Sequence, residues 1–255
     1  MALCHPVNPH IAHVVESFRV TKRKTMKIRS LNVGSGKLTK IRTYLKKPAT
    51  IYLLQEHFKA CHEIKKFKTQ LRNFTNKILL IKSARKRTKR FGRNRGGLAL
   101  IIKNNISFSV THTSNFRIQG VELTINKKSL QCLNIYLPNE RKRNISELEM
   151  VLKEVNKIML KCPHPLIVGG DLNYDISRRD TTYNKIIKNF LKINKLKLVW
   201  ETNKFDVKST YLHHNKNTSV IDHFAYRGNL KVLKGGVENT KQLGHSPIWM
   251  DFCLT

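Results

Sequence analysis

The sequence predicts a single domain of the α/β class. Short apolar runs alternate with amphipathic segments along the chain, as they do when strands and helices pack in layers. With 255 residues, of which 40% are hydrophobic, the chain can form one large core and is too apolar to be disordered. No internal repeat and no linker rich in proline or glycine divides it. We therefore expect one domain over residues 26–255, preceded by a loosely ordered basic leader over residues 1–25.

The first half of this domain is expected to contain two helices among several strands. Residues 26–32 (MKIRSLN) and 50–56 (TIYLLQE) are typical of strands, and residues 36–47 between them have the period of an amphipathic helix. A second helix is predicted around residues 61–76. Several strands, partly in hairpins, should follow between residues 77 and 136.

The second half is expected to begin with the best-defined helix of the chain, over residues 146–161. Ser146 and Glu149 have the spacing of a capping box, and an apolar face follows them. A buried strand, PLIVGGD, and a further helix over residues 183–194 come next. From residue 197 onward the pattern predicts mostly strands.

The charge balance predicts a polyanionic partner. The chain has 49 Lys and Arg residues against 16 Asp and Glu residues, a formal net charge of +33. Such a field favours nucleic acid. A membrane is not expected as a partner, because the basic residues do not gather on one amphipathic helix. Part of the excess of lysine and asparagine can reflect the base composition of the gene.

The cysteines and the N-terminal region indicate a reducing compartment. The five cysteines are scattered and include no Cys-x-x-Cys pair, which argues against a disulfide scaffold and against a zinc site. Residues 1–25 lack the apolar core of a signal peptide, and no apolar run has the length of a membrane span. We therefore expect that the protein is not secreted.

Carboxylates are rare in this chain, and three of them follow apolar runs. Glu56 comes after IYLLQ, Asp171 after LIVGG and Asp222 after SVI, while Asn32 has the equivalent place after MKIRSL. A carboxylate at such a position is costly unless it is paired, metal-bound or hydrated. Each one alone can be a cap or a turn residue. Together they predict a site, because strand ends in α/β folds converge on one face.

The proposed ligands are all carboxylates and amides once Asn173 is added. Hard oxygen donors suit Mg²⁺, with Mn²⁺ as the alternative, rather than zinc. A divalent cation beside a basic surface is what phosphodiester hydrolysis requires, since it neutralises the charge that develops on the phosphoryl oxygens.

Seven short motifs occur in an order that resembles the endonuclease/exonuclease/phosphatase superfamily over roughly residues 26–253. The basic charge, GVELTINKKSLQCLNIYLPN and IVGGDLNYDISR are most similar to the apurinic-type endonuclease domain of non-LTR (LINE-like) retrotransposons. The seven motifs are LNVGSGK (31–37), LLQEH (53–57), RGGLALII (95–102), NIYLPN (134–139), GGDLN (169–173), SVIDH (219–223) and GHSPI (244–248).

This resemblance implies a fold, an activity and partners. The fold would be a four-layered, DNase I-like α/β sandwich, with two mostly antiparallel sheets packed face to face and helices outside. The activity would be Mg²⁺-dependent nicking of DNA that leaves a 3′-hydroxyl to prime reverse transcription. The implied partners are the target DNA, an attached or separate reverse transcriptase and element RNA. The implied location is the nucleus, after passage through the cytoplasm.

The resemblance also assigns roles to the residues at the strand ends. Glu56 should bind the catalytic Mg²⁺, with Asn32 close by as a further ligand. Asp171 should orient or deprotonate the attacking water, helped by Asn173.

A second group is expected to act on the phosphate. Tyr136 should contact the scissile phosphate, and Asp222 should pair with His245 and hold its imidazole against a phosphate oxygen. A carboxylate partner fixes the tautomer of a histidine and favours its charged form, which stabilises the negative charge of the transition state.

The segment 82–95, KSARKRTKRFGRNR, carries eight positive charges and no negative one. A run of this kind can be a solvated loop or a nuclear-import signal, and its position before the GGLALII strand equally favours contact with a DNA backbone. The residues expected to contact DNA are Arg85, Lys86, Arg87, Lys89, Arg90, Arg93, Arg95, Ser219 and His223.

One position departs from the family pattern and keeps two alternatives open. Members of the family usually have aspartate immediately before the histidine, where this chain has Gly244. A catalytically weakened nucleic-acid-binding module is therefore one alternative. The other is a phosphatase similar to the inositol-polyphosphate 5-phosphatases, because GDLNY (170–174) resembles those enzymes too.

Overall fold

The computed structural model describes residues 24–34, 38–86, 93–178, 181–202, 205–238 and 244–255. Almost all of the predicted leader lies outside these residues, as do Arg87, Lys89 and Arg90 of the basic segment. None of the helices in the described ranges is long and apolar enough to cross a membrane.

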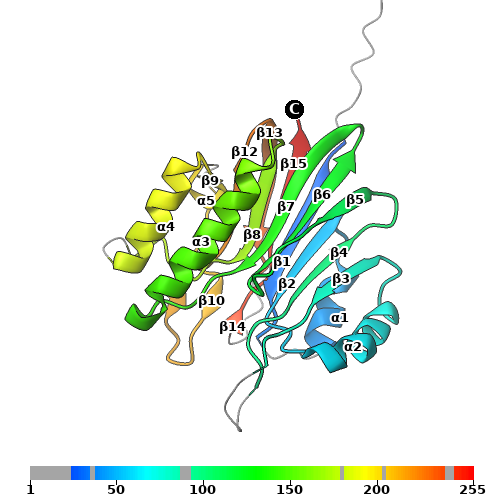
Figure 1. The fold of residues 1–255 in the computed structure, drawn as a ribbon, viewed down its shortest axis with the longest axis horizontal. Helices are drawn as coiled ribbons and strands as arrows, with labels where there is room; N and C mark the ends of the chain where they lie inside the picture. Colours follow the sequence, from blue (N-terminus) through cyan, green and yellow to red (C-terminus); the bar gives the residue numbers. More distant parts are fainter. Residues whose placement is uncertain (1–23, 35–37, 87–92, 179–180, 203–204, 239–243) are drawn as a thin grey trace, which may run out of the picture.

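Two six-stranded sheets form the centre of the molecule (Figure 1). The first sheet has the order β13 (Leu230–Val237), β15 (Ile248–Leu254), β1 (Met26–Asn32), β2 (Ile51–Gln55), β4 (Leu98–Ile102) and β3 (Ile78–Lys82). The second has the order β5 (Ser107–Thr111), β6 (Ile118–Ile125), β7 (Lys128–Tyr136), β8 (Leu166–Asp171), β12 (Asp222–Arg227) and β9 (Lys197–Leu198).

Both sheets are mostly antiparallel, as predicted. In the described residues each sheet has one parallel pair, β1 with β2 and β7 with β8. Parallel neighbours need a crossover connection. Helix α1 (Leu38–Lys46) connects the first pair and α3 (Ile145–Leu160) connects the second.

The helices cover the outer faces of the two sheets (Figure 1). Helices α1 and α2 (Ile64–Arg72) pack on the first sheet, and α3 and α4 (Thr182–Ile193) on the second. The predicted four-layered, DNase I-like sandwich is thus confirmed. The short elements are η1 (Cys61–Glu63), η2 (Lys142–Asn144), α5 (Val199–Thr202) and a small sheet of β11 (Thr218–Ser219), β10 (Tyr211–Leu212) and β14 (Gly244–His245).

The continuous apolar runs arise because the central strands are buried on both faces. On β2, Leu53 packs between the two sheets, whereas Tyr52 and Leu54 pack under the helices. On β4, Leu100 faces the other sheet and Ile101 faces the helices. A strand with this environment cannot alternate between apolar and polar residues.

The capping box predicted for α3 does not form. The helix begins at Ile145, so Ser146 lies within its first turn, and the N-cap position is occupied by Asn144. The side-chain amide of Asn144 donates to the backbone and side-chain oxygens of Asn139 instead of capping the helix. The preceding 3₁₀ turn η2 takes the place of a capping box in starting the helix.

Candidate active site

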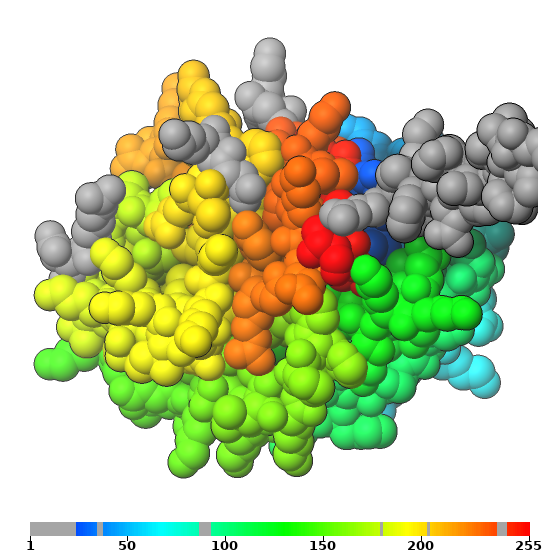
Figure 2. All heavy atoms as spheres, turned by 90° about the horizontal axis from the view of Figure 1, so that it is seen from above, coloured from blue at the N-terminus to red at the C-terminus, as the bar shows by residue number. Residues whose placement is uncertain are grey.

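Polar side chains gather at the end of the sandwich where β1, β2 and β8 finish. The opposite end, seen in Figure 2, carries the β12–β13 connection and the end of β15. Asp171 is the last residue of β8 and pairs in register with Asp222, which is the first residue of β12. The sequence suggested that Asp222 ends a strand, but it is the first residue of one. It still reaches the same edge, because β12 runs antiparallel to β8.

His245 joins these two carboxylates. Its Nδ1 lies 2.8 Å from Oδ2 of Asp222, and its Nε2 lies 3.7 Å from Oδ2 of Asp171. All three side chains are buried. The structure thus brings together the histidine and both carboxylates that the sequence predicted, although 74 positions separate Asp171 from His245 along the chain (245 − 171).

The charges of this group are coupled. Burial disfavours the charged imidazole, but the carboxylates of Asp222 and Asp171 and the hydrogen bond to Asp222 outweigh it and raise the pKa of His245 to about 9. Burial raises the pKa of Asp171 above its usual range, and the nearby Asp222 and Glu56 add to this, while His245 and Asn32 oppose it. At neutral pH the histidine is therefore an imidazolium.

The small third sheet holds His245 in place. His245 pairs with Tyr211 across β14 and β10, and the two rings meet edge to face with centroids 4.5 Å apart. The ammonium of Lys40 donates to the carbonyl oxygen of His245 at 3.3 Å. Thr210 fixes the backbone that carries the partner carboxylate, because its hydroxyl oxygen accepts from the backbone amides of Ile221 and Asp222.

Two amides orient Asp171. The Nδ2 of Asn32 donates to Oδ2 of Asp171 at 2.9 Å, and the backbone N–H of Asn173 donates to Oδ1 at 2.9 Å. The Oδ1 of Asn32 accepts from the backbone amide of Gly34. The side chain of Asn173 donates to the carbonyl of Leu137, so it fixes the turn that follows β8.

Glu56 lies just beyond β2, in a left-handed backbone conformation with φ of 58°. Such a conformation is uncommon outside glycine and persists where the surroundings impose it. The hydroxyl of Tyr136 donates to Oε1 of Glu56 at 2.6 Å. Burial and the neighbouring carboxylate raise the pKa of Tyr136 well above its usual range, so the phenol stays protonated and acts as a donor.

Arg117 supports Tyr136 from behind. Its guanidinium lies over the Tyr136 ring, 4.9 Å from the centroid, and donates to the Tyr136 carbonyl. Glu147 of α3 accepts from the same guanidinium at 2.9 Å. The tyrosine is therefore held by a cation that is itself held by an ion pair.

The residues of this edge fit a divalent cation. Oxygen donors of Glu56, Asn32 and Asp171 are of the kind that Mg²⁺ prefers. Burial is the main cause of the raised pKa of Asp171, and the carboxylates of Asp222 and Glu56 add to it, so an added cation would favour the charged form of Asp171. The ligand atoms of Asp171, Asp222 and His245 also lie within 4.8 Å of one another. Because His245 is charged, it is better suited to a phosphate than to a metal.

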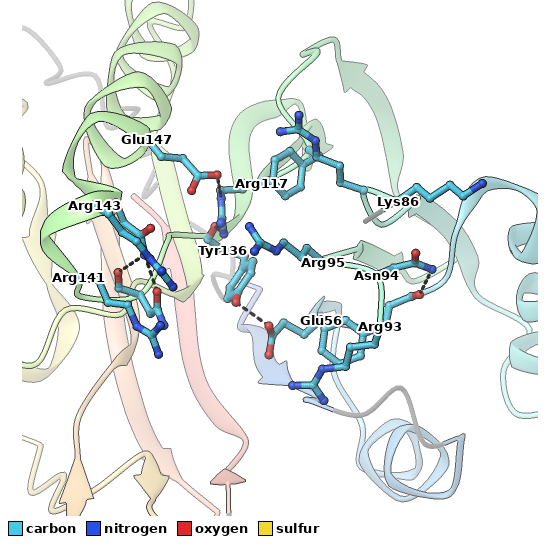
Figure 3. Close-up of a pocket in the computed structure, with 15 residues that line it drawn as sticks. Glu56, Lys86, Arg93, Asn94, Arg95, Arg117, Tyr136, Arg141, Arg143 and Glu147 are labelled. Carbon is cyan, nitrogen blue, oxygen red and sulfur yellow. Dashed lines mark hydrogen bonds and ion pairs between the residues drawn. The ribbon is translucent and has the colours of Figure 1, made fainter. Parts of the chain in front are cut away.

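A pocket of about 810 Å³ adjoins Glu56 and Tyr136 (Figure 3). Four residues predicted to contact DNA line it, and the structure adds three arginines that the basic segment does not contain. The predicted residues are Arg85, Lys86, Arg93 and Arg95, and the added ones are Arg117, Arg141 and Arg143.

The structure does not support two of the predicted DNA contacts. His223 is fully buried, and its Nε2 lies 2.7 Å from the carbonyl of Tyr174 and 3.0 Å from that of Val220. It follows Asp222 on β12 and therefore points to the opposite face. Ser219 is also buried, and its hydroxyl contacts Nε2 of His213 at 2.9 Å.

Several supporting residues gave no recognisable signal in the sequence. The fold alone brings three of them, Thr210, Tyr211 and Lys40, into contact with Asp222 or His245. Arg117 immediately precedes the segment IQGVELTI of β6, which gives it only a weak signal. Glu238 does not replace the missing carboxylate at position 244, since it forms ion pairs with Arg29 and Lys47.

Comparisons with known proteins agree with this fold. A family model described as the endonuclease/exonuclease/phosphatase family matches residues 30–242. A search of curated proteins found no match.

Three solved structures illustrate the fold-level similarity. The AP endonuclease LMAP from Leishmania major is 13% identical, with a TM-score of 0.70 over 91% of this chain and 88% of the other. The endonuclease domain of TRAS1, a telomere-specific non-LTR retrotransposon, is 15% identical, with a TM-score of 0.65 over 91% and 99%. The 3′ phosphatase NExo from Neisseria, bound to product DNA hairpin, is 15% identical, with a TM-score of 0.63 over 88% and 98%.

Proposed function

Because this chain belongs to the endonuclease/exonuclease/phosphatase family, as its ordered motifs predict, we propose that it is a Mg²⁺-dependent endonuclease that nicks DNA. The observation that carries the proposal is the meeting of Asp171 with the charged His245–Asp222 pair at one buried edge. This group provides a base and a cation at adjacent positions, which a nucleic-acid-binding module does not require.

The proposed reaction is hydrolysis of one phosphodiester bond. A water oxygen attacks the phosphorus, the bond from phosphorus to the 3′-oxygen breaks, and the leaving 3′-oxygen takes up a proton from solvent. The products are a 5′-phosphate and a 3′-hydroxyl. Asp171, oriented by Asn32 and the amide of Asn173, positions the water and receives its proton. A raised pKa suits a base that works near neutral pH.

The remaining side chains act on the phosphate. The imidazolium of His245 donates from Nε2 to a phosphate oxygen, while Asp222 fixes its orientation through Nδ1. Tyr136 offers its hydroxyl, which donates to Glu56 in this structure, to the same phosphate. Glu56 and Asn32 would hold the divalent cation, whose charge stabilises negative charge on the phosphate oxygens.

Nicking of supercoiled plasmid DNA in the presence of Mg²⁺ tests the proposal. The wild-type protein should convert supercoiled to open-circular plasmid, and Glu56→Ala and His245→Ala should lose most of this activity. Glu149→Ala and His112→Ala are matched controls, because they remove an exposed glutamate and an exposed histidine that do not line the adjoining pocket. Absence of nicking by the wild type, or equal nicking by all variants, contradicts the proposal.

The chemistry of the cut ends tests the link with retrotransposition. A nick with a 3′-hydroxyl is extended directly by a DNA polymerase, whereas a 3′-phosphate blocks extension. We propose that such ends prime a reverse transcriptase, attached or separate, on element RNA in the nucleus. Release of phosphate from an inositol polyphosphate without any nicking would instead support the phosphatase alternative.

A further inference from the structure

The arginine-lined pocket beside Glu56 and Tyr136 has properties that general DNA affinity does not explain. We propose that it binds an unpaired stretch of the DNA strand next to the scissile phosphate. This inference rests on the proposed function, because the scissile phosphate defines which part of the strand the pocket would bind. Two walls form the pocket: one carries Arg93 and Arg95, the other Arg141 and Arg143, and Tyr136 lies between them (Figure 3).

The pocket selects arginine over lysine. The chain has 16 arginines among its 49 basic residues, so the remaining 33 are lysines. The pocket reverses this ratio, because six arginines and one lysine line it. Base composition of the gene can raise lysine over the whole surface, but it does not place arginine in one cavity. Arginine is favoured where planar, two-pronged recognition of phosphate or stacking on a ring is required.

Within the part of the chain that the structure describes, most of this charge has no acidic partner. Arg117 is neutralised by Glu147. Among the described residues, the other arginines of the pocket form no ion pair, and Arg95, Arg141 and Arg143 are exposed. Several uncompensated cations in one concavity repel one another unless an anion lies among them. The ligand is therefore expected to carry more than one phosphate.

Besides Arg117, two of the guanidinium groups in the pocket lie over aromatic rings. Arg93 lies 4.4 Å from the centroid of Phe58, and Arg85 lies 5.7 Å from that of Phe116. An arginine held on a ring presents a flat surface to solvent, and unpaired bases stack on such surfaces as they do on aromatic side chains. Bases inside a duplex have no free face to offer, so this arrangement favours an unpaired strand.

Hydrogen bonds of the backbone and of asparagine side chains fix both walls. The backbones of Arg85 and Arg95 exchange hydrogen bonds of 2.9 and 3.0 Å at the base of the first wall, and Asn94 donates to the carbonyl of Phe58. In the second wall, Asn144 donates to both oxygens of Asn139.

Binding of fluorescent oligonucleotides without divalent metal tests the inference. The probes are a single-stranded oligonucleotide and a duplex of the same length and sequence, measured by anisotropy at one salt concentration. The double variant Arg85→Ala/Arg93→Ala removes the two exposed guanidinium groups that lie over Phe116 and Phe58. It should weaken single-strand binding by at least about tenfold, given the usual strength of base stacking, and duplex binding clearly less. Arg85→Lys/Arg93→Lys keeps the charge and should still lose several-fold on the single strand.

A matched control separates the pocket from general charge. Lys185→Ala/Lys188→Ala removes two exposed cations from α4 and should weaken both probes equally and slightly. Equal losses on both probes in the Arg85 and Arg93 variants, or full binding by the double lysine variant at those two positions, would overturn the inference. The measurement involves no cleavage, so its result does not depend on the plasmid assay that tests the proposed function.

Discussion

The buried His57 should make the stability of this protein fall as the pH is lowered. His57 is fully buried directly after Glu56. Its Nε2 lies 3.0 Å from the carbonyl of Lys82 and 3.3 Å from that of Leu98, while its Nδ1 accepts from the backbone N–H of Lys59 at 3.0 Å. These contacts require the neutral ring with its proton on Nε2. Burial is the main cause that lowers the pKa of His57 to about 4.

The sign and the size of the effect follow from this pKa. In the unfolded chain the ring takes up a proton near the ordinary value of 6.5, whereas in the folded protein it does so only near 4. Between these values the unfolded state binds more protons, so the free energy of unfolding decreases as the pH falls. At roughly 1.36 kcal/mol for each pH unit, the loss from this residue is about 2.5 kcal/mol at about pH 4.5.

Urea unfolding of wild type and His57→Gln, near pH 7 and at about pH 4.5, measures this loss. Glutamine keeps a donor and an acceptor but does not titrate, so the variant should lose about 2.5 kcal/mol less between the two conditions. Other groups with shifted pKa values, such as His223, act equally in both proteins. His112→Gln, at an exposed position, is the control. If the free energy of unfolding falls equally in wild type and His57→Gln between the two pH values, His57 is not buried as a neutral ring in the folded protein.

Three further changes have defined outcomes. Gly97→Ala should lower the free energy of unfolding by more than about 2 kcal/mol, because the φ of 90° is strained for alanine and its Cβ would lie 2.5 Å from the His57 ring. Urea unfolding measures this, and an unaltered midpoint contradicts it. In Asp222→Asn, His245 loses the carboxylate that favours its charged form. The rate of single-turnover nicking should therefore fall at a lower pH than the value near 9 expected for the wild type. An unchanged pH profile argues against the imidazolium. Gly244→Asp should be compared with Gly244→Asn, since both meet the same strain at φ of 94° in open space. A gain with Asp alone would show that the missing carboxylate limits the rate, and equal rates would show that glycine suffices.

The sequence predicts the parts of this structure that depend on local patterns. Strands β2 and β8 are continuous apolar runs because they are buried on both faces. A carboxylate at the end of such a run is costly unless it is paired, hydrated or bound to a metal, so it indicates a site. Glu56 and Asp171 could therefore be identified before the fold was known. His245 required the order of the motifs, because a single histidine in a turn carries no signal of its own.

The parts that depend on tertiary contacts could not be predicted. Thr210 fixes Asp222 across twelve positions of the chain, and Tyr211 reaches His245 only because β10 and β14 pair. The error at His223 has a simple cause: adjacent residues of a strand face opposite ways, so the neighbour of a site residue enters the core. Arg141 and Arg143 could not be predicted, because they lie far along the chain from the basic segment 82–95, and only the fold brings both into one pocket.

Contacts that involve no side chain at position 244 restrain His245. They are the bond to Asp222, the ring of Tyr211 and the ammonium of Lys40. Glycine in place of the usual aspartate therefore lacks a carboxylate but keeps these restraints. Nor is that carboxylate needed for the charge of the imidazole, because Asp222 and Asp171 already raise its pKa to about 9 against the effect of burial. The electrostatic part of the proposed mechanism thus operates at neutral pH with glycine at this position, and only a direct role of the missing carboxylate on metal or water could make it limiting.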